Sequence, residues 1–246
     1  MRKQILYYVL KYKGEYKQIK RAIERNEEWE NVECEENYVT ILDDEYPKEF
    51  FELDEPPYLF FYRGNLELLK KEKVSVIGSR ECSEYANQTC FDLISGLKKD
   101  VVIVSGMAKG IDAIAHLNAI SLHHFCIGVI GCGCDIFYPK ENKELYEEVI
   151  NHHLLISEYP KGVSPLSYHF PARNRLIAAL GKACYVIEAK SKSGTMITAN
   201  YAVSLNREII AFPYRYNDAF GKGCNELIEQ GASIFIPESW KVLTKK

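Results

Sequence analysis

From Lys73 onward, short apolar, β-branched runs alternate with segments of helical hydrophobic spacing. The apolar runs lie at 74–79, 101–106, 125–131, 154–159, 183–189, 208–213 and 232–236. The helical segments lie roughly at 84–98, 110–122, 141–151, 172–180, 194–206 and 224–230. Strands that are apolar along their whole length and are separated by helices indicate a mostly parallel sheet with both faces covered. The sequence therefore predicts a doubly wound α/β fold.

Residues 1–55 have a different pattern and predict a small helical N-terminal subdomain ahead of a core at 56–246. Apolar residues at helical spacing indicate one amphipathic helix around residues 5–10 and a second around 19–23. The tandem Pro56-Pro57 cannot occupy a helix interior, so it indicates a linker into an extended segment around 59–62. We place the domain boundary near residue 55.

The composition argues against several classes of protein. No stretch approaches the roughly 20 apolar residues of a membrane helix, and no secretion signal is evident, so we expect a cytoplasmic protein without membrane contact. The eight cysteines form no C-x-x-C pair, which favours reduced thiols over disulfides or a metal site. The net charge of −3 combines an acidic N-terminal third with basic loops elsewhere, and can therefore hide a basic face.

Small and polar residues follow four of the predicted strands. They read GSR at 78–80, SGMAKGID at 105–112, GCGCD at 131–135 and EAKSKSGT at 188–195. Ligands of open α/β sheets bind at these carboxyl ends, where glycine allows close backbone approach and helix N-termini attract anions. Arg80, Lys109, Lys140 and Lys192 add full positive charges near the same edge. Together they predict a phosphate-binding site.

Two nucleotide-binding fingerprints are missing from the chain. There is no G-x-G-x-x-G after the first core strand and no G-x-x-x-x-G-K-[ST] anywhere. Neither an NAD site nor a P-loop ATPase is supported, and no cofactor is expected. The phosphate groups can then belong to a mononucleotide or to a polynucleotide backbone.

The segment SYHFPARNRLIAAL, residues 167–180, places aromatic rings beside two arginines. Arg173 and Arg175 fall at a predicted helix start, where positive charge is unfavourable unless an anion is present. Single-strand sites combine rings that stack on bases with guanidinium groups that hold phosphates. The alternative is that one of the two arginines pairs with a buried acid such as Glu158 or Glu188.

Taken together, these segments resemble the DNA-processing protein A family (DprA, also called Smf). The resemblance covers about residues 56–236, with the motifs in the family's order and spacing. They read GSR, SGMAKGIDAIAH, GCGCDIFYPKEN, SEYPKG, FPARNRLIAAL, EAKSKSGTMITANYA and GKGCNELIEQGA. The resemblance implies a Rossmann-like core that is not an enzyme. It also implies that the core binds single-stranded DNA, forms a homodimer, protects incoming strands and loads RecA recombinase onto them during natural transformation.

The resemblance also assigns residues to the DNA site and to the dimer. DNA contacts fall at Arg80 in the GSR turn and Lys140 in YPKEN. The remaining predicted DNA-binding positions, on the glycine turns and in FPARNR, are Gly78, Ser79, Gly106, Lys109, Gly110, Phe170, Arg173, Asn174, Arg175, Ser193, Gly194 and Thr195. The apolar positions that match the family's dimer contacts are Val203 and Ile228.

Some features depart from the family pattern, and two other functions stay open. The chain reads Pro213-Tyr214 where the family usually has a P-G turn, and Ser167 stands where some members carry a basic residue. It ends at Lys246, so we expect it to lack the winged-helix-like domain of many members. One alternative is a nucleotide phosphoribohydrolase-like enzyme that uses Glu188. The other is a protein-interaction module whose glycine loops are purely structural.

Overall fold

A nine-stranded sheet runs through residues 1–237, the part of the chain that the computed structural model describes. Its strand order is β1-β2-β6-β5-β4-β3-β7-β8-β9. The strands are β1 (Asn37–Thr40), β2 (Leu59–Gly64), β3 (Lys73–Ile77), β4 (Val102–Ser105), β5 (Cys126–Ile130), β6 (Leu154–Ser157), β7 (Ala183–Val186), β8 (Glu208–Ala211) and β9 (Ser233–Ile234). From β6 to β9 all neighbours pair in parallel, whereas β1 and β2 are antiparallel additions at one end.

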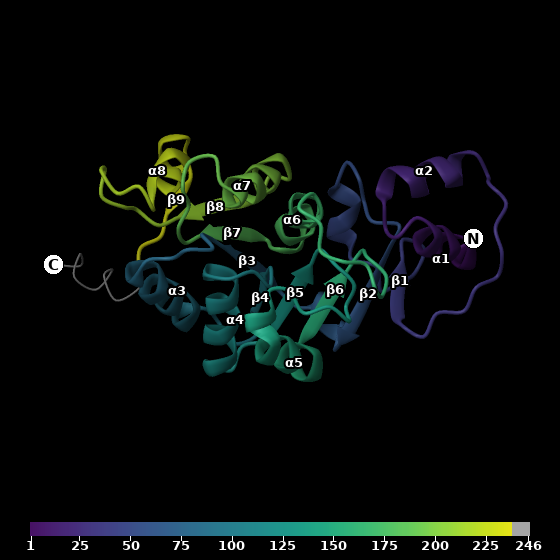
Figure 1. The fold of residues 1–246 in the computed structure, drawn as a ribbon. Helices are drawn as coiled ribbons and strands as arrows, with labels where there is room; N and C mark the ends of the chain where they lie inside the picture. Colours follow the sequence, from purple (N-terminus) through teal and green to yellow (C-terminus); the bar gives the residue numbers. More distant parts are fainter. Residues whose placement is uncertain (238–246) are drawn as a thin grey trace.

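Helices cover both faces of this sheet, as Figure 1 shows. Three helices of the core, α3, α4 and α5, lie on one face, and α6, α7 and α8 lie on the other. The helices are α1 (Arg2–Lys11), α2 (Tyr16–Glu24), α3 (Glu84–Gly96), α4 (Ile111–Ser121), α5 (Lys143–His152), α6 (His169–Leu180), α7 (Gly194–Ser204) and α8 (Lys222–Glu229), with short 3-10 turns η1 (Lys48–Glu52), η2 (Leu66–Lys70) and η3 (Lys140–Asn142).

Side-chain alternation along the central strands explains the two helical layers. Ile103 on β4 belongs to the hydrophobic cluster under α3 and α4, whereas its neighbours Val102 and Val104 belong to the cluster under α6 and α7. Successive residues of a strand point to opposite faces, so an unbroken apolar run can supply both clusters. The predicted doubly wound α/β architecture is confirmed.

The order of connections creates one crevice at the middle of the sheet. From β3 the chain moves through β4 and β5 to β6, and then returns to the other side of β3 to form β7. The loops after β3 and β7 therefore diverge to opposite sides of the sheet. Ligands bind open α/β sheets at such a switch point, outside the carboxyl ends of the strands.

The N-terminal region contains the two predicted helices and also a strand that was not predicted. β1 pairs with β2 in the register Asn37↔Tyr62, so residues on both sides of position 55 share one sheet. Ile5 and Leu6 of α1 belong to the same hydrophobic cluster as Leu59 and Phe61 of β2. The domain boundary near residue 55 stays a prediction, and residues 238–246 of the predicted core lie outside the described part of the chain.

No helix within residues 1–237 is both long enough and apolar enough to cross a lipid bilayer.

The eight cysteines all fall within the described residues, and each is a free thiol. Six of them are buried, and burial raises the pKa of the Cys132 thiol to about 11, so this thiol is protonated at neutral pH.

Candidate nucleic-acid interface

The GSR turn, residues 78–80, leaves β3 at the switch point and is fixed by the helices on either side. The Ile111 N–H at the start of α4 donates to the Ser79 carbonyl at 3.0 Å. The Thr195 hydroxyl in the first turn of α7 donates to the Gly78 carbonyl at 2.9 Å. Gly110 has φ +72°, and a side chain there would also meet the Ser79 and Arg80 carbonyls, so glycine is required.

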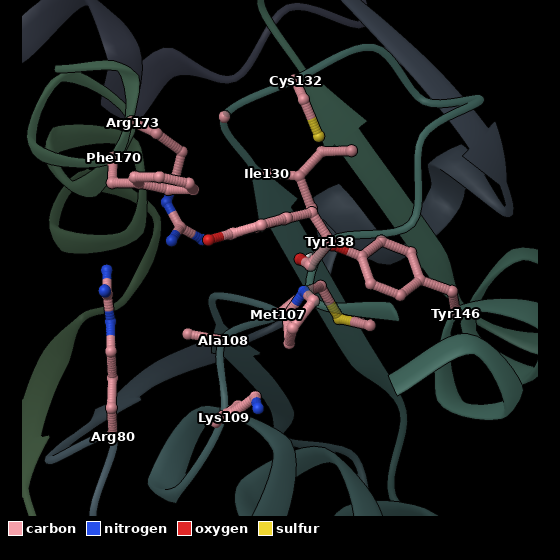
Figure 2. Close-up of a pocket in the computed structure, with 12 residues that line it drawn as sticks. Arg80, Met107, Ala108, Lys109, Ile130, Cys132, Tyr138, Tyr146, Phe170 and Arg173 are labelled. Atoms are coloured by element: carbon pink, nitrogen blue, oxygen red, sulfur yellow. Dashed lines mark hydrogen bonds between the residues drawn. The ribbon is translucent and has the colours of Figure 1, made fainter. Parts of the chain in front are cut away.

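Arg80 extends from this turn over an aromatic stack. Its guanidinium carbon lies 5.5 Å from the centre of the Phe170 ring, and Phe170 in turn stacks on Tyr138 with centroids 5.6 Å apart. Figure 2 shows the Arg80 side chain reaching towards Phe170 and Arg173. Arg80 and Tyr138 are exposed, so both a charge and a ring face are available to a ligand.

Two adjoining cavities open beside this stack within the described residues. The apolar cavity, of about 100 Å³, is drawn in Figure 2. Its lining includes Met107, Lys109, Ile130, Cys132, Tyr138, Tyr146 and Pro139. The polar cavity, of about 370 Å³, is lined among others by Gly78, Ser79, Glu81, Asp112, Asn174, Lys190, Ser193, Gly194, Thr195 and Thr198. Arg80, Ala108, Phe170 and Arg173 line both cavities and form the wall between them.

Arg173 is the buried cation of this wall, with 4% of its surface exposed. It donates to the Val129 carbonyl, while its Nε has no hydrogen-bond partner among the described residues. Burial lowers the pKa of Arg173 and raises the pKa of Asp112, and the attraction between the two groups opposes both shifts. A side chain at Gly106 would overlap both groups, which explains glycine at this position.

Exposed lysines lie around the two cavities: Lys109 and Lys140, which the sequence predicts for the site, and Lys190, which it does not. Lys109 pairs with Glu141 at 2.7 Å, and Lys190 pairs with Glu81 at 3.2 Å. Lys140 follows the cavity-lining Pro139 and has no carboxylate within 4.0 Å in the described part of the chain. Exposed ion pairs contribute about 0–1 kcal/mol, so phosphate groups can displace the carboxylates at little cost.

Arg175 lines neither of the two cavities, in contrast to Arg173, and its prediction as a DNA contact is not supported by its surroundings. Its Nη1 and Nη2 bond to the Glu158 carboxylate at 2.5 and 2.6 Å, and both residues are buried. The Arg175 Nε also donates to the Glu55 carbonyl at 3.1 Å. The guanidinium is thus fully engaged by the protein, and the alternative of a buried Glu158 partner is correct for this arginine.

Glu188 does not line either cavity, which removes the main support for an enzyme of the phosphoribohydrolase type. It is fully buried, and it accepts hydrogen bonds from the Ser83 hydroxyl at 2.5 Å and the Tyr214 hydroxyl at 3.2 Å. Tyr214 is the residue that replaces the glycine of the usual P-G turn. Its hydroxyl therefore helps to hold Glu188 in the interior.

Tyr138 and Asp112 also belong to this candidate interface, although the sequence did not predict either. Tyr138 immediately precedes the Pro139-Lys140 pair, and its nearness to a predicted contact was the available signal. Asp112 faces Arg173 across Gly106, a contact between distant loops that no local pattern reveals.

His116 forms a hydrogen bond with the backbone of the loop that contains Gly106. Its burial predicts that the stability of the fold decreases at acid pH. It is fully buried with Nε2 2.8 Å from the Gly106 carbonyl, and burial lowers its pKa from 6.5 to about 4. The unfolded chain therefore takes up this proton first, and we expect stability to fall by roughly 3 kcal/mol between pH 6.5 and 4. Urea unfolding at several pH values measures the slope. His116→Gln should flatten it, and an unchanged slope in that variant would contradict the assignment.

Comparison with known proteins decides the family. The family model described as DNA recombination-mediator protein A matches residues 37–244. This chain belongs to that family. Among curated members, the DNA processing protein DprA of Streptococcus pneumoniae is 47% identical over 195 residues, which cover 79% of this chain and 69% of the relative. The DprA of Bacillus subtilis is 37% identical over 198 residues, which cover 80% of this chain and 67% of that relative.

Two solved DprA structures share this fold. The X-ray structure of the Streptococcus pneumoniae protein matches 100% of this chain and 93% of its own, with a TM-score of 0.83 and 38% identity. A Helicobacter pylori DprA structure, described for its unique single-stranded DNA binding mode, matches 87% of this chain and 99% of its own, with a TM-score of 0.75 and 34% identity. The predicted DprA/Smf family and Rossmann-like fold are confirmed.

The predicted dimer residues lie on the helices near the far end of the sheet. Val203 on α7 is 55% exposed, and Ile228 on α8 is half-buried. Both are thus on or near the surface, and neither lines either of the two cavities. Pairing of DprA protomers through these positions stays a prediction.

Proposed function

We propose that this DprA family member binds single-stranded DNA across the wall between the two cavities. The observation that carries the proposal is the exposed Arg80 guanidinium above the stacked Phe170 and Tyr138 rings. A flexible strand needs both a cation for its phosphates and a ring face for an unstacked base. The Helicobacter pylori relative, named for its single-stranded DNA binding mode, supports the same ligand class.

In this proposal the protein acts by binding and performs no chemical step. Arg80, Lys109 and Lys140 hold successive phosphates, and the amides of the GSR turn assist them. Phe170 and Tyr138 stack on bases, which gives affinity with limited sequence preference. Arg173 is buried beneath the strand and supplies positive potential to both cavities.

Membership of the family supports a wider role. We infer that the protein is a cytoplasmic recombination mediator that protects incoming strands and loads RecA onto them during natural transformation. Two protomers pair through the surface around Val203 and Ile228. The free thiols are consistent with a reducing compartment.

The proposal predicts strand binding that weakens with salt. Three phosphate contacts at about 0.7 released counterions each give a slope of about −2 for log affinity against log salt. Fluorescence anisotropy of labelled oligothymidylate at several salt concentrations measures this slope. Absence of binding at micromolar protein and low salt would contradict the proposal.

A single substitution can show whether the salt dependence of binding comes from a specific phosphate contact or from the net charge of the protein. Lys140→Gln should reduce the magnitude of the slope by about 0.7, because one counterion-releasing contact is lost. Lys182→Gln is the matched control, since Lys182 is exposed before β7 at the opposite edge of the sheet. Equal slopes for the two variants would place the strand elsewhere.

A further inference from the structure

Several groups that can bind an anion line the polar cavity. It lies on the α7 side of the Arg80–Phe170 wall, and its volume of about 370 Å³ falls within the roughly 300–1,000 Å³ of small-ligand sites. Its floor is formed by the start of α7 and the end of β3. This is the position at which a βα unit presents a helix N-terminus to a phosphate.

The first turn of α7 has unused hydrogen-bonding groups. Ser193 is the N-cap residue, yet its hydroxyl makes no capping bond, and its Oγ is buried without a partner among the described residues. The N–H groups of Met196 and Ile197 donate to the Ser193 carbonyl at 3.1 and 3.4 Å. The preceding amides, on Gly194 and Thr195, belong to residues that line the cavity and precede the helical bonding pattern.

A buried cation, Arg173, also lines the polar cavity. Arg173 is more than nine-tenths buried, lines the cavity, and has an unpartnered Nε in the described part of the chain. Arg80 and Lys190 also line the cavity, against the carboxylates of Glu81 and Asp112. The cavity is thus lined by three cations and two carboxylates, and the Asp112 carboxylate is attracted to Arg173. The site therefore carries a net positive charge. Such a site favours an anion of high charge.

We propose that the polar cavity binds the phosphomonoester group of a nucleotide, either free or at the end of a DNA strand. A phosphomonoester carries about −1.5 to −2 charge at neutral pH, more than the single charge of an internal phosphodiester. Phe170, on the wall shared with the apolar cavity, offers a ring face to the attached base. The inference rests on the proposed strand binding, because the same wall guides a strand end into the cavity.

Gly194 offers a direct way to test this site. A Cβ added there would meet nothing within 4 Å, so a small side chain fits without displacing the fold. Gly194→Asp places a negative charge at the helix N-terminus, where it favours the helix and repels a phosphate. Gly194→Asn has the same shape without the charge and is the matched control. Thermal melting confirms that both variants are folded.

The experiment compares internally labelled oligothymidylates with a 5′-phosphate, a 3′-phosphate or hydroxyl ends, alongside free thymidine monophosphate and thymidine. We expect wild type to prefer one phosphorylated oligonucleotide, or the free monophosphate over thymidine, by about tenfold. A preference confined to oligonucleotides identifies a strand end as the ligand, and one confined to the monophosphate identifies a free nucleotide. Gly194→Asp should reduce the ratio to about one, and Gly194→Asn should reduce it less, because it adds a side chain of the same shape without the charge.

The same measurements distinguish a missing phosphomonoester site from a missing site for single-stranded DNA. Ratios near one in every comparison, with the hydroxyl-ended oligonucleotide still bound, would overturn the phosphomonoester site alone. An undiminished ratio in Gly194→Asp would also overturn it. Loss of all oligonucleotide binding by wild type would instead overturn the proposed function.

Discussion

Reversing the charges of Arg80 and Lys140 together is expected to abolish binding of single-stranded DNA while leaving the fold intact. Both side chains are exposed, so Arg80→Glu and Lys140→Glu remove no buried contact. A charged hydrogen bond contributes about 1.5–3 kcal/mol, so loss of two such contacts predicts affinity at least about 100-fold weaker, before any repulsion. Anisotropy titration with oligothymidylate measures the loss, and circular dichroism checks the fold.

A second double variant controls for net charge. Lys70 and Lys182 are both exposed and lie near the amino ends of β3 and β7, at the opposite edge of the sheet. Lys70→Glu with Lys182→Glu changes the net charge by the same amount. We expect this protein to bind within a few-fold of wild type. Equal losses in the two double variants would show that only the overall charge matters.

Breaking the buried Arg175–Glu158 pair is expected to have the largest effect on stability. Glu158→Gln leaves the guanidinium buried without its carboxylate, and removal of one partner from such a pair typically costs about 3–5 kcal/mol. Replacing both residues, with Glu158→Leu and Arg175→Met, should cost much less, because no unpaired charge remains. Urea unfolding of the three proteins measures the difference.

The same variants separate the two arginines of FPARNR by role. Glu158→Gln protein that remains folded should bind oligothymidylate as wild type does, since the pair lines neither cavity. If its folded fraction lost strand binding, Arg175 would belong to the DNA site after all. A double apolar replacement as unstable as Glu158→Gln would show that the ion pair is not the source of the effect.

The sequence predicted the strands of the core because their patterns are local. The VVIV run at 101–104 is apolar throughout, and the parallel sheet buries both faces of β4. β1 was not predicted, since Asn37–Thr40 becomes a strand only through pairing with β2, more than twenty residues later. The strand order also depends on such long-range pairing and has no local signature.

The sequence predicted the backbone turns of the candidate site better than the directions in which its side chains point. The glycine turns predicted the edge of the sheet at which the two cavities lie, because the requirement for glycine is local. Arg173 and Arg175 looked equivalent in the sequence, yet two residues apart on a helix they point roughly 200° apart. Only one of them can therefore face the cavities, and the position of Glu158 decides which. Helix rotation of this kind is set by tertiary packing.

A crystal structure of the protein with a short oligothymidylate tests the central claim most directly. We predict a phosphate within hydrogen-bonding distance of Arg80, a second beside Lys140, and a base stacked on Phe170 or Tyr138. A strand bound at another surface, with Arg80 and Phe170 left uncovered, would contradict the proposed mode of binding.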